Sequence, residues 1–159
     1  MTKQIPEALK KDVKLTILET GAMGTIGVFS SAADVMSIAG SWGYLLMRYA
    51  RYYRYTIDLE MAKKLCVTVL LGMGGYYFGC KTATRLFHII PGAGTLAAMG
   101  ISSLQNVIFT YRFAVTLTCV FSAGCVKLDT LADSIKCMFA SSNQGLLSVK
   151  EIVGLCIGK

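Results

Sequence analysis

The chain has 159 residues, of which 54% are hydrophobic and 16% are charged, and its formal net charge is +7. Soluble domains carry about 25% charged residues, so a soluble domain of this size would have to hide an unusual amount of apolar surface. This composition argues against a simple soluble monomer and favours membrane contact or obligate oligomerisation.

The basic residues form small clusters that border apolar blocks, and they do not form one stripe. This placement fits anchoring at anionic lipid headgroups better than nucleic-acid binding, so we expect no nucleic-acid partner. The clusters are Lys10, Lys11 and Lys14; Arg48, Arg51 and Arg54; Lys63 and Lys64; and Lys81 and Arg85.

The N-terminal residues up to about Lys14 are polar and predict a short mobile arm or a weak amphipathic helix. The residues that follow break at Gly21 and Gly24 without a small-residue cleavage site, so no signal peptide is predicted. We divide the chain into an N-terminal arm (1–14), an apolar helical domain (15–126) and C-terminal amphipathic helices (127–159).

A helix is predicted to start near Ala32, capped by Ser30 or Ser31. Its apolar residues recur at three- and four-residue spacing, which indicates one buried face. Aromatic and basic residues alternate at its end, which suits a membrane–water boundary, where ring bodies bury and polar tips stay wet. A solvated helix end in a soluble bundle explains this pattern equally well. The buried-face residues are Val35, Ile38, Ala39, Trp42, Leu45 and Leu46, and the candidate membrane-interface residues are Arg48, Arg51, Tyr52 and Tyr55.

Asp58 is predicted to cap the next helix, with Glu60 in its first turn, where the helix dipole favours an anion. The uncharged run Leu65–Cys80 follows. Within this run, Gly75 and Gly79 form a GxxxG pair, a pattern that lets a second helix approach closely.

The longest uncharged run is Leu86–Tyr111, with 26 residues. A bilayer span needs about 20 mostly apolar residues, so the run is long enough. Pro91 divides it, because proline favours the first turn of a helix and restricts the residue before it. We therefore predict a central apolar helical hairpin over about Lys64–Arg112, with its tip near Pro91.

The second arm of this hairpin starts with small residues, so Gly92 and Gly94 join Pro91 as candidate helix-packing residues. The arm is predicted to pack against Leu65–Cys80, and Gln105 and Asn106 inside it would then need hydrogen-bond partners. Beyond Arg112 the helix is expected to continue.

The last part of the chain predicts two shorter helices. One has an apolar stripe, and Ser148 and Glu151 form a capping box for the other, Val149–Cys156. Together the predicted elements give an all-α fold, a helical bundle around the hairpin. The stripe consists of Leu128, Leu131, Ala132, Ile135 and Phe139.

The residues predict no catalytic, cofactor-binding or metal site. The only histidine, His88, lies in an apolar run, and the PGAG segment at Pro91 lacks the GK[ST] ending of a phosphate loop. The six cysteines form no CxxC pair and are interpreted as buried small hydrophobes. We therefore expect a non-enzymatic protein without a cofactor.

The runs ADVMSIAGSWGYLLMRYARYYRYTIDLEMAKKL and IIPGAGTLAAMGISSLQNVIFTYRFAVTL resemble the YcjF-type family of uncharacterised bacterial hydrophobic domains. The likeness covers roughly residues 30–125 and departs at TYRFAV, where members have an alanine–leucine–glycine. The resemblance implies a membrane-associated module, or a partner of a GTPase, without catalytic residues. The matching positions are Asp34, Tyr53 or Tyr55, Pro91, Gly92 and Gly94.

The sequence leaves three functions open. The first is a membrane-associated helical protein, with the lipid membrane as partner and self-assembly into a homo-oligomer through its glycine faces, at an inner or cytoplasmic membrane. The second is a soluble helical adaptor or scaffold that binds a protein partner such as a GTPase. The third is a membrane-disrupting effector.

Overall fold

A computed structural model describes residues 4–27, 31–73, 94–124 and 126–141. These residues form helices and no strands, which confirms the predicted all-α bundle. The predicted hairpin tip near Pro91 and the last helix at Val149–Cys156 lie outside the described residues. The helices are α1 (Glu7–Gly27), α2 (Ser31–Tyr52), α3 (Leu59–Gly72), α5 (Gly94–Ser122) and α6 (Leu131–Ser141).

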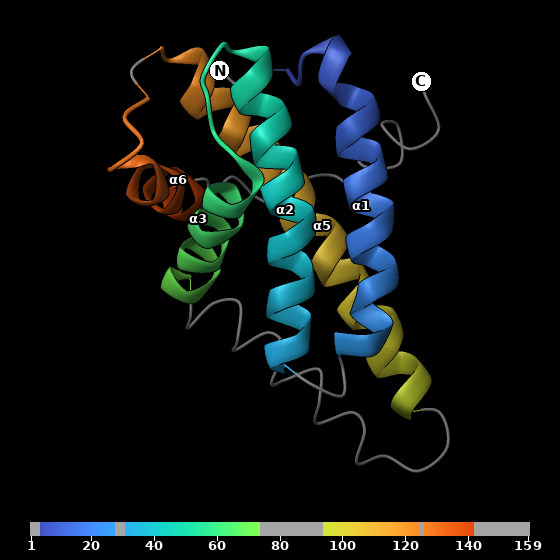
Figure 1. The fold of residues 1–159 in the computed structure, drawn as a ribbon. Helices are drawn as coiled ribbons and strands as arrows, with labels where there is room; N and C mark the ends of the chain where they lie inside the picture. Colours follow the sequence, from blue (N-terminus) through green and yellow to red (C-terminus); the bar gives the residue numbers. More distant parts are fainter. Residues whose placement is uncertain (1–3, 28–30, 74–93, 125, 142–159) are drawn as a thin grey trace.

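Helices α1 and α2 lie side by side and antiparallel, and α5 crosses behind both of them (Figure 1). Helices α3 and α6 lie on the other side of α2 from α1. The main partners of α3 are α2 and α6, whereas the main partner of α5 is α1. Within the described residues, the two arms of the predicted hairpin therefore pack on other helices and not chiefly on each other, which corrects that expectation.

Helix α1 begins at Glu7 and is continuous across residue 14. Its buried residues Leu9, Val13 and Ile17 recur every fourth position, so one face of the helix packs on the bundle. The start of the chain from residue 7 is therefore a packed amphipathic helix and not a mobile arm.

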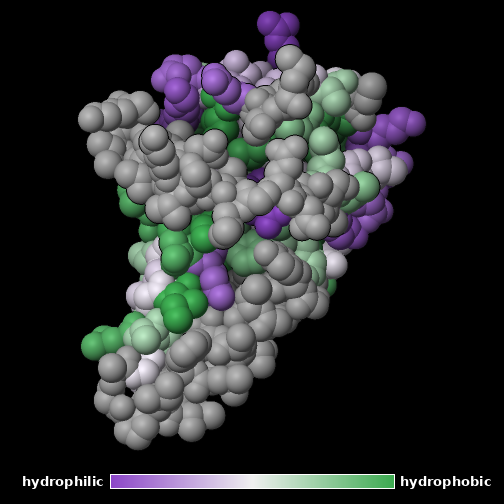
Figure 2. Space-filling view, turned by 180° about the vertical axis from the view of Figure 1, so that it is seen from behind, coloured by the Kyte–Doolittle hydropathy of each residue, from purple (hydrophilic) through white to green (hydrophobic). Residues whose placement is uncertain are grey.

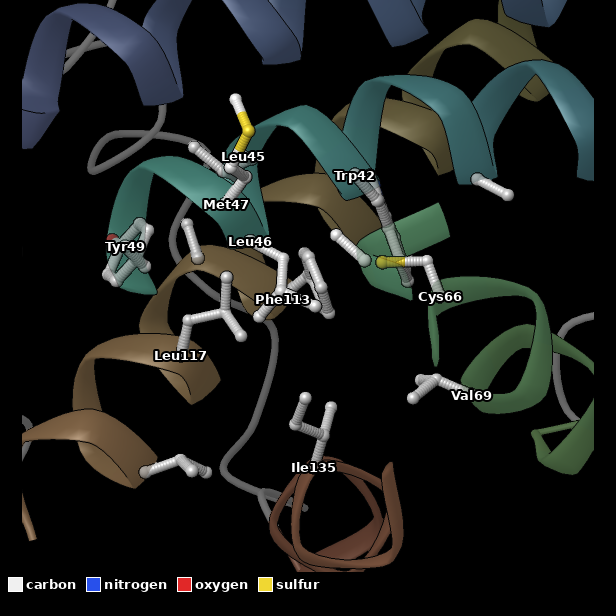
Figure 3. Close-up of a cluster of buried hydrophobic side chains, with 14 of the residues drawn as sticks. Trp42, Leu45, Leu46, Met47, Tyr49, Cys66, Val69, Phe113, Leu117 and Ile135 are labelled. Atoms are coloured by element: carbon white, nitrogen blue, oxygen red, sulfur yellow. The ribbon is translucent and has the colours of Figure 1, made fainter. Parts of the chain in front are cut away.

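The core lies where α2 meets α5, α3 and α6 (Figure 3). Trp42 is fully buried and stacks on Phe113, with 4.1 Å between ring centroids and a 6° angle between ring planes. Stacked aromatic pairs contribute about 0.5–1.5 kcal/mol beyond the area that they bury. The predicted buried face of α2 is confirmed in full, because Val35, Ile38, Ala39, Trp42, Leu45 and Leu46 are all buried.

Helix α3 starts as predicted, since the Asp58 carboxylate accepts a hydrogen bond from the Met61 backbone N–H at 2.7 Å. The predicted stripe on α6 is also buried, at Leu131, Ala132, Ile135 and Phe139. Leu128 is an exception, because it lies in the turn before α6 and is 40% exposed.

Helix α5 runs without a break through Arg112 to Ser122, 29 residues in all. Asn106 is fully buried on it, and its side-chain amide donates a hydrogen bond to the Thr20 carbonyl at 3.0 Å. The expected partner for this buried amide is therefore present, and it comes from α1.

Candidate functional site

Four side-chain hydrogen bonds fix the axial position of α2, and of the turn after it, relative to α5. In each bond the two partners are 68 or 69 residues apart, so the two segments run parallel in constant register. The bonds join Trp42 Nε1 to Thr110 Oγ1 (2.9 Å), Tyr49 Oη to Thr118 Oγ1 (3.0 Å), Tyr53 Oη to Ser122 Oγ (2.9 Å) and Tyr55 Oη to the Gly124 carbonyl (3.3 Å).

The second half of α1 is joined to the same part of α2 and α5 through Thr20 and Thr110. The hydroxyls of Thr20 and Thr110 are 2.8 Å apart, and Thr110 also accepts the indole N–H of Trp42. Near the start of α1, Asp12 accepts a hydrogen bond from Arg48 Nε at 3.0 Å. Because α1 runs opposite to α2, its first turns lie beside the last turns of α2.

This register places three regions without basic residues at the same end of the bundle. Residues 15–27 of α1, 31–47 of α2 and 94–111 of α5 contain no lysine or arginine, and their only acids are Glu19 and Asp34. We call this part the apolar end. Seen from behind, hydrophilic residues gather along the top and upper right of the molecule, whereas hydrophobic residues line its lower left margin, where α5 begins (Figure 2).

The apolar end leaves large hydrophobic side chains in contact with solvent. On α5, Leu96 is 74% exposed and Leu104 is 50% exposed, with Ile101 between them at 37%. We call these three residues the exposed face of α5. Leu15 and Leu18 on α1 and Met36 on α2 are more than half exposed as well.

Helix α5 is long and apolar enough to cross a membrane, by length and composition, and it lies in the middle of the chain. Of its most apolar 18-residue stretch, 56% is buried inside the bundle, and core helices of soluble proteins meet the same criteria of length and composition. The exposed face of α5 is the part of this helix that the core does not cover, and exposed apolar patches mark contacts with membranes, proteins or ligands.

The opposite end of the bundle is basic and aromatic. Of the four candidate interface residues, Arg51 and Tyr52 are exposed, whereas Arg48 pairs with Asp12 and Tyr55 donates to the Gly124 carbonyl. The structure therefore brings all four to one end, but only two of them project freely. We call residues 7–14 and 48–55 the basic end.

Two tyrosines of this end, Tyr49 and Tyr53, are held against α5 by hydrogen bonds and ring contacts. Burial raises the pKa of the Tyr49 phenol, so this hydroxyl stays protonated and keeps its hydrogen bond to Thr118. Tyr53 stacks on Phe121, with 5.7 Å between ring centroids. These contacts join the last turns of α2 to α5 at the basic end.

Four of the five predicted helix-packing residues lie outside the described residues: Gly75, Gly79, Pro91 and Gly92. Gly94 is described, and it is the buried first residue of α5.

Helices α1 and α5 come close together at Gly21 and Gly24, which were not among the predicted packing residues. A Cβ added at Gly24 would lie 2.5 Å from the Ser103 Cα, and one at Gly21 would lie 2.9 Å from Val107 Cγ2. The available signal was the presence of small residues within an apolar run, because small residues let helix backbones approach closely.

In the described part of the chain, no group of three or more His, Cys, Asp or Glu side chains is placed to hold a metal ion. Cys66 is buried, as interpreted, but Cys137 is exposed, so the interpretation was wrong for that residue. No family model matches the chain, and no curated protein or solved structure matches it either.

Proposed function

We propose that this protein is a non-enzymatic, membrane-associated helical bundle. Its apolar end enters the hydrocarbon of a bilayer, and its basic end lies among the lipid headgroups. The observation that carries the proposal is the exposed face of α5, where Leu96, Ile101 and Leu104 project from a charge-free stretch of helix.

The dimensions of the apolar end support this proposal. Its α5 part, residues 94–111, has 18 residues, and at 1.5 Å per residue it is about 27 Å long. The hydrocarbon core of a bilayer is about 30 Å thick. Transfer of one fully exposed leucine or isoleucine side chain out of water contributes about 1.5–3 kcal/mol. At their partial exposures, Leu96, Ile101 and Leu104 together contribute roughly 2–5 kcal/mol.

Two features limit how deep the bundle inserts. Asp34, in the first turn of α2, works against insertion, because a charge near the membrane centre costs a few kcal/mol. On the α3 side, Lys64 pairs with Glu60 and Lys136 pairs with Asp133, which suits contact with water. We therefore propose that the molecule enters with its apolar end only, while α3 and α6 stay near the surface.

The experiment is flotation of the full chain with lipid vesicles, compared with recovery in the soluble fraction without detergent. Leu104→Asp places a charge on the exposed face of α5 and should abolish flotation. The matched control is Leu128→Asp, which introduces the same charge at a residue of similar exposure (40% against 50%) beside Lys127 and Asp129.

The control should float like the unchanged protein. A monodisperse soluble protein that ignores vesicles would overturn the proposal and favour an adaptor that binds a protein partner. Dye release from the same vesicles would instead identify a membrane-disrupting effector.

A further inference from the structure

Four cations at the basic end have no anionic partner within the described ranges. The ion pairs at this end are Lys10 with Glu7 and Arg48 with Asp12. The remaining cations are Lys11 and Lys14 on α1, Arg51 in the last turn of α2, and Arg54 just after it. The basic end therefore carries excess positive charge that the fold itself does not neutralise.

These four cations lie within about two to three helical turns of one another along the bundle axis. The bond between Asp12 and Arg48 sets residue 12 of α1 level with residue 48 of α2. Lys11 and Lys14 are within two positions of Asp12, and Arg51 and Arg54 are one to two helical turns from Arg48. They thus form a collar, about two to three turns deep, at the end of the bundle opposite the exposed face of α5.

Arg54 has a backbone conformation that is unfavourable for any residue with a side chain. Helix α2 ends in a Schellman motif, in which the Tyr55 N–H donates to the Ala50 carbonyl (2.8 Å) and the Arg54 N–H donates to the Arg51 carbonyl (3.1 Å). Arg54 takes the left-handed position of this motif, with φ of 65°, where glycine is usual. Arginine therefore occupies a position where glycine would be less strained. Since strained residues cluster at functional sites, this indicates that the charge of Arg54 has a functional role.

We propose that this collar of Lys11, Lys14, Arg51 and Arg54 binds acidic phospholipid headgroups and so selects anionic membranes. The proposal rests on the membrane association proposed above, because the apolar end supplies insertion and the collar supplies lipid selectivity. Charge complementarity supports lipid headgroups as the partner, since cations just outside an apolar segment attract anionic headgroups at the membrane surface.

The test compares flotation of the full chain with vesicles of phosphatidylcholine alone and with vesicles that also contain phosphatidylglycerol. Each lysine or arginine near an anionic surface strengthens binding about fivefold. We therefore expect the double variant Lys11→Gln with Arg51→Gln to bind the anionic vesicles about 25-fold more weakly, with binding to the neutral vesicles unchanged.

The matched control is Lys63→Gln with Lys64→Gln, which removes the same net charge from exposed positions on α3, away from the collar. This control should lose less than half as much affinity, on a logarithmic scale. A second variant, Arg54→Gly, should raise the melting temperature by relieving the positive φ and yet bind anionic vesicles about fivefold more weakly. If Arg54 had only a structural role, its replacement by glycine would not raise the melting temperature and at the same time weaken binding to anionic vesicles.

The outcomes distinguish the two proposals. Equal binding of the unchanged protein to neutral and anionic vesicles would overturn the collar and leave membrane association standing. Equal losses in the α1–α2 and α3 double variants would also overturn it, because net charge alone would explain the binding. Failure to float with either vesicle would overturn both proposals.

Discussion

Substitution of Gly24 by alanine tests the close contact between α1 and α5. The added Cβ would lie 2.5 Å from the Ser103 Cα, 2.6 Å from its backbone N and 2.8 Å from the carbonyl carbon of Ser102. All three are backbone atoms, which cannot rotate away as a side chain can. Since carbon atoms pack at about 3.5–4.0 Å, the two helices would have to separate by about 1 Å.

The cost of this separation follows from the contacts beside Gly24. Overpacking costs about 1–3 kcal/mol. A 1 Å opening would stretch the 2.8 Å contact between Thr20 and Thr110, and the 3.0 Å bond from Asn106 to the Thr20 carbonyl, beyond hydrogen-bonding distance. Each of these bonds contributes about 1 kcal/mol. Alanine regains about 1 kcal/mol of helix propensity, so the net destabilisation is about 2–4 kcal/mol.

Unfolding measured by the loss of helical circular dichroism provides the assay. For a protein of this size, 1 kcal/mol shifts the melting temperature by about 2–4 °C, so Gly24→Ala should melt about 10 °C lower. The control is Gly100→Ala, an exposed position on α5 where the new Cβ meets no atom within 4 Å, and it should melt slightly higher. Equal stability of the two variants would refute the close helix contact.

Two further predictions concern buried groups. Thr110→Val should destabilise the fold by about 1–3 kcal/mol in urea unfolding, because it removes the acceptor of the Trp42 indole and the partner of the Thr20 hydroxyl, whereas Thr110→Ser should be nearly neutral. An unchanged unfolding midpoint for the valine variant would contradict this network. Burial raises the pKa of the Cys66 thiol, so less thiolate forms, and peptide mapping after maleimide treatment of the folded protein should show modification of exposed Cys137 well before Cys66. Equal rates at the two cysteines would mean that α3 opens readily.

Local patterns in the sequence determined the helices and the faces that they bury. The spacing of Val35, Trp42 and Leu46 identified the buried face of α2, and the side chain of Asp58 identified the start of α3, because both signals act within one or two helical turns. The uncharged runs also predicted a long apolar helix, which is α5.

Tertiary structure decided which helices pair and where their charges gather. Sequence spacing suggested that α3 and α5 would pack as a hairpin, but the close contact of Gly24 with Ser103 pairs α5 with α1. Such pairing depends on how small and large residues fit between segments far apart in the chain, which no local pattern encodes. The same pairing turned basic clusters that are separate in the sequence into one basic end, because α1 and α2 run in opposite directions and are held in register by the bond between Asp12 and Arg48.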